Sequence, residues 1–146
     1  MDSKLKDFTK KALEVGNGVL KLLPTWVPRS FLTPGRRLKL HPDDLYILGA
    51  ERGGMDERWL ASTTKAYNGP LTPEDEGLSY VVLAEQKYTL KDIIECCGEK
   101  IIGGDMMEKY GDLKIYAKFF DNMGPIPLHV HQMADQGGCC GRRDGD

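Results

Sequence analysis

The chain has 146 residues, a formal net charge of −2 and a hydrophobic fraction of 40%. This length is sufficient to bury one core, so a single domain is expected. The nearly balanced charge argues against a nucleic-acid partner. No apolar run approaches the roughly 18 residues of a transmembrane helix, so no membrane partner is expected either.

Residues 1–4 lack the charged-then-apolar order of a signal peptide, which favours the cytoplasm. The four cysteines form two adjacent pairs, Cys96 with Cys97 and Cys139 with Cys140. This spacing is typical of neither a zinc ribbon nor a secreted disulfide framework, so we expect reduced thiols.

The first element is predicted to be an amphipathic helix over about residues 3–23, ended by Pro24. A lysine-rich helix can also lie on a membrane surface, but Asp7 and Glu14 interrupt its basic character and favour packing against protein. Its apolar residues recur at steps of three and four: Leu5, Phe8, Ala12, Val15, Val19 and Leu22.

Residues 24–42 contain four prolines and predict an irregular connector with one short strand. Its basic cluster, Arg36, Arg37 and Lys39, could meet a phosphate, although surface cations near a loop are more often only solvated. Further along, residues 68–77 (NGPLTPEDEG) carry turn chemistry throughout and predict a surface loop.

Residues 80–84 (YVVLA) are short and apolar, which predicts a strand. A helix should then open at Thr89, because Thr89 and Asp92 form a capping-box pair, and it should close at Gly98. On this helix Cys97 shares the apolar stripe and is expected in the core, whereas Cys96 is less constrained.

Residues 113–120 alternate in polarity, which is typical of a half-buried strand. Residues 121–125 predict a turn, and residues 126–131 predict a second strand on which His129 and His131 share one face. Two imidazoles on one strand face can hold a divalent ion, although such a pair also occurs on surfaces by chance. The pair cannot choose among zinc, manganese, iron and nickel.

Residues 113–132 (LKIYAKFFDNMGPIPLHVHQ) resemble the region of type I mannose-6-phosphate isomerases in which one strand turns into the strand bearing the first metal ligands. Residues 53–62 (GGMDERWLAS) are similar to the same family's glycine-glycine, glutamate, tryptophan and serine segment. Residues 76–79 (EGLS) resemble its glycine-serine-leucine neighbourhood. The three matches occur in the family's order.

The resemblance implies a mainly β fold with helices (α+β), a partial cupin or jelly-roll barrel over residues 1–135, preceded by the N-terminal helix. Residues 136–146 have no strand or helix pattern and are expected to form a flexible tail. The resemblance implies zinc, or another divalent metal, on His131 and His129, although many members have glutamine at the position of His129. Asp135 resembles the glutamate position of the general cupin motif.

The implied activity is metal-dependent interconversion of aldose and ketose phosphates, of the mannose 6-phosphate and fructose 6-phosphate type. Ser62, Trp59 and Lys118 are weaker candidates for lining the substrate pocket, and the catalytic base is unassigned. The family draws further ligands from later in its chain, so an incomplete N-terminal fragment is expected. One alternative is a non-catalytic cupin module that binds metal or sugar and is completed as a homodimer. A further alternative is an interaction domain with incidental histidines.

Overall fold

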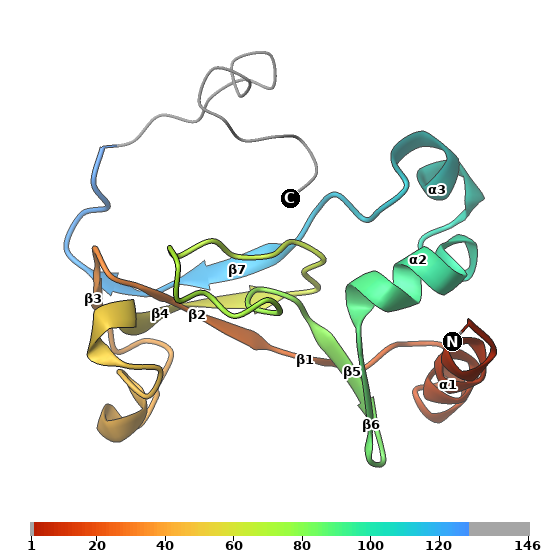
Figure 1. Cartoon of the computed structure of the whole chain (residues 1–146), viewed down its shortest axis with the longest axis horizontal. Helices are drawn as coiled ribbons and strands as arrows, with labels where there is room; N and C mark the ends of the chain where they lie inside the picture. The colour runs from red at the N-terminus through yellow and green to blue at the C-terminus, as the bar shows by residue number, and fades with distance from the viewer. Residues whose placement is uncertain (1, 129–146) are drawn as a thin grey trace.

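The computed structural model describes residues 2–128 (Figure 1). Its first element, α1 (Asp2–Val15), buries Leu5, Phe8 and Ala12 against the rest of the protein. The helix is shorter than expected, because Asn17 and Gly18 adopt positive φ angles of 51° and 85° that end it. The prediction that it continues to residue 23 is therefore wrong.

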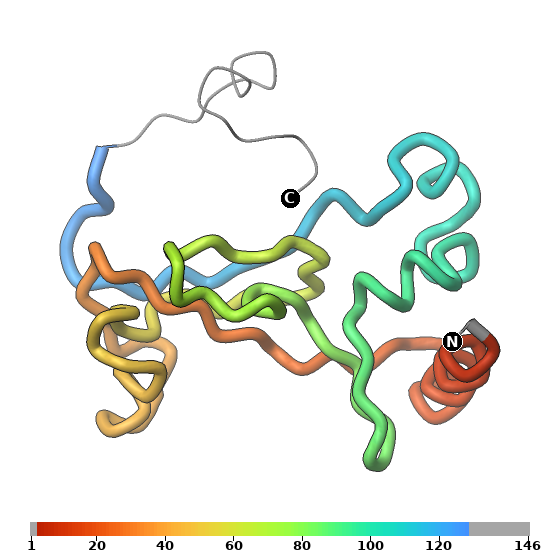
Figure 2. Tube along the Cα trace, in the orientation of Figure 1, coloured from red at the N-terminus to blue at the C-terminus, as the bar shows by residue number. Residues whose placement is uncertain are grey.

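Within residues 2–128, eight strands form three small antiparallel sheets, in the orders β1-β5-β6, β2-β4-β7 and β3-β8. The strands are β1 (Leu22–Leu23), β2 (Thr25–Arg29), β3 (Thr33–Pro34), β4 (Gly54–Leu60), β5 (Tyr80–Leu83), β6 (Gln86–Thr89), β7 (Ala117–Phe120) and β8 (Asn122–Met123). The connector over residues 24–42 thus supplies two short strands where one was expected. Two 3-10 turns, Pro42–Asp44 and Ala50–Arg52, lie in the segment at the end of the molecule farthest from the helices (Figure 2).

Two separate apolar clusters stabilise the molecule. The first joins α1 to Val81 of β5 and to Ile93 of α2 (Leu90–Ile101). The ring of Phe8 meets that of Tyr88 edge-on, with centroids 4.7 Å apart. The second cluster lies on the β2-β4-β7 sheet, and its buried members are Val27, Trp59 and Ala66. The predicted loop over residues 68–77 and the predicted strand at residues 80–84 are both confirmed, the latter as β5.

The predicted capping box of α2 (Leu90–Ile101) is confirmed: Asp92 N donates to Thr89 Oγ1 at 3.0 Å. The expected end at Gly98 lies next to a break in helical geometry at Cys97 (φ −133°, ψ 19°), but α2 as a whole continues past it to Ile101. Gly98 is buried within α2. Met107 of α3 (Gly104–Tyr110) packs directly on it, because an added Cβ would lie 2.3 Å from Met107 Sδ. Cys96, rather than Cys97, packs against the first apolar cluster.

The strand predicted over residues 113–120 begins only at Ala117, as β7. The apolar side chains of the predicted segment point outward, since Ile115 before β7 and Phe119 within it are 67% and 58% exposed, whereas Tyr116 and Lys118 contact β4 side chains. The predicted turn over residues 121–125 instead contains β8, which pairs with β3.

Residues 126–128, expected to open the histidine-bearing strand, are exposed and lie outside any strand. His129 and His131 themselves lie outside the described residues, as does the tail from residue 136. The described part of the chain is a mixed α+β structure with antiparallel sheets, in agreement with the coarser prediction, and it forms no closed barrel. No helix between residues 2 and 128 has the length and apolar character needed to cross a bilayer.

Candidate functional site

The central strand β4 carries two adjacent acids, Asp56 and Glu57, that have almost no exposed surface, at 0% and 1%. The strand lies between β2 and β7. Val27 pairs with Glu57 and Pro28 pairs with Met55, so Asp56 is an extra residue without a partner on β2. Such β-bulges re-aim side chains and are over-represented beside active sites.

Both oxygens of Glu57 are occupied by donors. Arg29 Nε donates to Oε1 at 2.6 Å, while Trp59 Nε1 and Lys118 Nζ donate to Oε2 at 2.6 and 3.1 Å. Burial acts to raise the pKa of Glu57, but these hydrogen bonds and the charges of Arg29 and Lys118 hold it below the ordinary 4.5. Glu57 is therefore a charged, fully hydrogen-bonded centre at neutral pH.

This centre continues into a chain of polar contacts beneath the segment that follows β4. The guanidinium of Arg29 also donates to Asn68, the amide of Asn68 donates to Glu76, and Arg52 donates to the second oxygen of Glu76. Arg52 and Glu76 are both buried. The network links two loops to the sheet, and it makes the position of Glu57 depend on several distant parts of the chain.

An aromatic pair forms one side of the Glu57 centre. Trp59 is buried and stacks on the half-buried Tyr116 with ring centroids 4.6 Å apart. Lys118 Nζ lies 5.7 Å from the Trp59 ring centroid and 4.4 Å from that of Phe120. Burial and the charge of Glu57 raise the pKa of the Tyr116 hydroxyl, opposed by the charge of Arg29.

Asp56 has a different environment from that of its neighbour. Neither of its carboxylate oxygens has a hydrogen-bond partner. Burial, reinforced by the adjacent charge of Glu57, raises its pKa to about 7, although Arg29 and Lys118 act in the opposite direction. A carboxyl group in this condition changes its charge near neutral pH, which is unusual for aspartate.

Two of the pocket residues predicted from the sequence come together here. Trp59 and Lys118 are register partners across β4 and β7, and both bind Glu57. Ser62 has another role, since its hydroxyl donates to the carbonyl of Thr64 at 3.1 Å and its N–H donates to Ser79 Oγ at 2.9 Å. Those bonds shape a buried turn and engage none of the Glu57 contacts.

The predicted metal ligands His129, His131 and Asp135 lie outside the described residues. Among residues 2–128, no group of three or more histidine, cysteine, aspartate or glutamate side chains could hold a metal ion. The third histidine, His41, is exposed, and its Nδ1 lies 3.4 Å from Oδ2 of Asp43. The described part of the chain therefore does not supply a set of three zinc ligands.

The basic cluster predicted as a possible phosphate contact remains at the surface, since Arg36, Arg37 and Lys39 are all exposed. Its loop is anchored by Leu38, whose N–H donates to Asp121 Oδ2 at 2.7 Å. No contact joins these cations to Glu57 in the part of the chain that is described.

Arg29, Glu57 and Tyr116 were not predicted as functional residues. One sequence signal was present, because residues 56–58 are three consecutive charges between apolar residues on both sides. Charges in such a setting are rarely left buried without partners. The identity of those partners could not be read locally, because Arg29 and Lys118 lie 28 and 61 positions away from Glu57.

No model of a protein family matches the chain, and neither a curated protein nor a solved structure does.

Proposed function

We propose that this chain carries the sheet platform of a metal-dependent, cupin-type isomerase of sugar phosphates, of the mannose 6-phosphate and fructose 6-phosphate type. One observation carries the proposal. The two segments with the most extensive resemblance, residues 53–62 and 113–132, contribute the adjacent antiparallel strands β4 and β7. Their pairing brings Trp59 and Lys118 together on one carboxylate, as expected if the two segments serve one site.

The chemistry requires a proton to move between neighbouring carbons through an enediol, and it requires cations for the phosphate. Lys118 suits the second task, because its side chain is 34% exposed while Glu57 holds its ammonium group. The half-buried ring of Tyr116, stacked on Trp59, offers an aromatic surface beside it. Zinc or another divalent ion belongs to the proposal, with His129 and His131, and more weakly Asp135, as its predicted ligands.

The proposal is tested by measuring conversion of mannose 6-phosphate to fructose 6-phosphate with added zinc, on this chain and on a version extended in frame. Lys118→Gln should raise KM by about tenfold, because a charged hydrogen bond to phosphate contributes on the order of 1.5 kcal/mol. Lys114→Gln, an exposed lysine on the same segment, is the matched control. If neither version of the chain binds mannose 6-phosphate or converts it, the proposal is rejected.

A second candidate is a cupin module that binds metal or sugar without catalysis and is completed by a second copy. It is favoured by one observation: β7 is the terminal strand of its sheet, and Ile115 and Phe119 beside it are exposed. Binding of zinc and mannose 6-phosphate without conversion would distinguish this candidate from the isomerase.

A further inference from the structure

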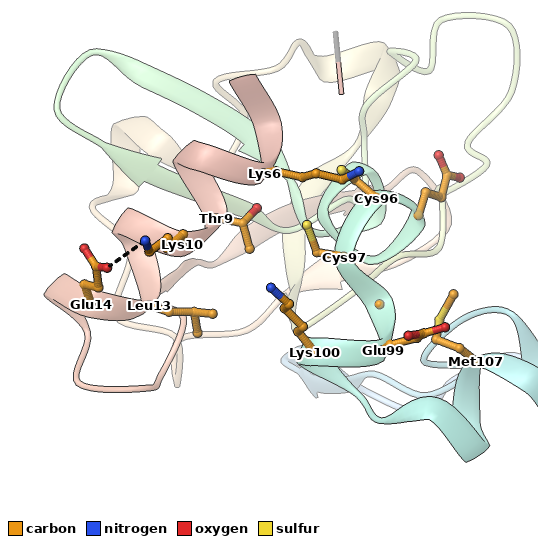
Figure 3. A pocket seen from close by; sticks show the side chains of 12 residues that line it. Lys6, Thr9, Lys10, Leu13, Glu14, Cys96, Cys97, Glu99, Lys100 and Met107 are labelled. Carbon is orange, nitrogen blue, oxygen red and sulfur yellow. Dashed lines mark ion pairs between the residues drawn. The ribbon is translucent and has the colours of Figure 1, made fainter. Parts of the chain in front are cut away.

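A pocket of about 580 Å³ lies between α1 and the C-terminal half of α2 (Figure 3). These two helices lie on the opposite side of the molecule from β3 (Figure 1). This volume is in the range of small-molecule sites. The side chains of Thr9 and Leu13 enter it from α1, and those of Cys97 and Lys100 enter it from α2 (Figure 3). None of these residues belongs to the Glu57 network.

Cys97 differs from an ordinary structural cysteine in its position. A free cysteine usually packs as a small apolar residue, and Cys96 does so against the first apolar cluster. Both thiols are half-buried and both line the pocket, but Cys97 is not among the residues packed against that cluster, and its sulfur points into the pocket toward α1 (Figure 3). The non-helical dihedrals at Cys97 interrupt α2 at this residue, so the helix departs from regular geometry where the thiol enters the pocket.

The charges that line the pocket are mixed, with three lysines and three glutamates: Lys6, Lys10, Lys100, Glu14, Glu95 and Glu99. Lys10 is paired with Glu14 at 4.0 Å. Lys100 forms no ion pair with any described residue, and its ammonium points into the space beside Cys97 (Figure 3). A ligand with both carboxylate and ammonium groups would complement such a lining.

We propose that this pocket is a thiol-disulfide exchange site, at which Cys97 forms a mixed disulfide with a small carboxylate-bearing disulfide of the glutathione disulfide type. The Cys97 thiol loses its proton to solvent, and the resulting thiolate attacks one sulfur of the ligand. The ligand's S–S bond breaks, and the other half leaves as a thiolate that takes up a proton. One disulfide is consumed and one is formed, so no other oxidant is needed.

The test is incubation of the full chain with glutathione disulfide, followed by mass mapping of the peptide that contains both thiols. The adduct should form on Cys97 several-fold faster than on Cys96. Cys97→Ser should abolish the fast adduct and Cys96→Ser should keep it, with circular dichroism to verify that both variants are folded. Equal or faster modification of Cys96 in the unsubstituted chain overturns the proposal.

The role of Lys100 is tested separately with two disulfides. Lys100→Gln should slow exchange with glutathione disulfide about fivefold, the scale of one exposed charge interaction. The same variant should leave exchange with the uncharged 2-hydroxyethyl disulfide unchanged, and Lys11→Gln, an exposed α1 lysine outside the pocket lining, should affect neither reaction. If Lys100→Gln slows exchange with both disulfides equally, or with neither, then Lys100 does not recognise the carboxylate of the ligand.

Discussion

At the residue scale, Glu57 shows how the β2-β4-β7 sheet accommodates a buried charge. Its two oxygens receive three donors, from β2, from β4 itself and from β7. A buried ion pair contributes little net stability compared with an apolar replacement of both partners. Removal of one partner, however, leaves the other charge buried and uncompensated.

Glu57→Gln is therefore expected to destabilise the protein by about 3–5 kcal/mol, because Arg29 and Lys118 lose the charge that balances them. Urea denaturation followed by circular dichroism measures the change. Glu74→Gln, which removes an exposed acid paired with Lys65, is the control and should have little effect. A loss for Glu57→Gln that is no larger than the control's would mean that the network is not stabilising.

The raised pKa of Asp56 predicts that this group stabilises the fold more at acidic pH than at neutral pH. Its folded-state pKa of about 7 lies above the ordinary 3.8, so the folded protein binds its proton more tightly than the unfolded chain does. Stability from this group is fully present below about pH 4, falls as pH rises to about 7, and is constant above that. The total corresponds to on the order of 4 kcal/mol.

Asp56→Asn should remove most of the fall in unfolding free energy between pH 5 and pH 8, measured by urea denaturation at each pH. The comparison uses the slope with pH, because the amide changes absolute stability for other reasons. A variant that retains the wild-type slope would place the titration elsewhere. Glu57, whose pKa is lowered, changes the slope only below about pH 4.5: its stabilisation is fully present above that pH and is lost as pH falls.

At the element scale, α2 depends on a local cap. Thr89→Ala should cost about 1 kcal/mol, because the N–H of Asp92 loses its acceptor at the first turn. Thr89→Ser keeps the hydroxyl and should retain most of the stability. Thermal unfolding of the two variants provides the measurement, and equal losses for alanine and serine would show that the methyl group, rather than the cap, is responsible.

The segment after β4 is held close to the sheet at Gly77, which has φ +86°. An added Cβ would lie 2.6 Å from the backbone N of Ala66 and 2.7 Å from Trp59 Cζ3. Gly103 has a similar φ of +92° with nothing within 4 Å, so Gly103→Ala isolates the backbone penalty. Gly77→Ala should be the more destabilising by roughly 1–3 kcal/mol in urea denaturation, and equal effects would mean that the segment moves away freely.

At the scale of the whole molecule, exposed apolar side chains gather on the outward side of β7 and on the residues that flank it. Phe119 lies on this outward face, Ile115 precedes the strand, and the exposed Met123, Ile126 and Leu128 follow in the chain. An apolar face beside a terminal strand favours association with another sheet. A second copy of the chain is the partner that the dimeric cupin candidate requires.

Sedimentation velocity over a range of concentrations should show self-association that Phe119→Ser weakens. Val82→Ser, at a half-exposed valine on β5, is the matched control because it removes similar apolar surface from another sheet. A wild-type chain that is strictly monomeric at all concentrations contradicts the dimeric candidate, and it leaves the isomerase proposal to be judged by its own assay.

The features that the sequence determined by itself are local. The capping box of α2, the short strand at residues 80–84 and the turn-rich loop at residues 68–77 each depend on neighbouring residues, and all are present. The start of the N-terminal helix follows the same logic. Its end does not, because Leu22 continues the helical spacing but reaches the same apolar cluster from β1.

Only the tertiary structure decided which face of β7 turns inward and which charges meet at Glu57. The alternation of residues 113–120 favours an inward apolar face, yet Trp59 and Glu57 on the neighbouring strand select Tyr116 and Lys118 instead. The physical reason is that a buried carboxylate must be compensated by whatever cations the fold brings to it. That requirement outweighs the burial of two apolar side chains, and strand periodicity carries no information about it.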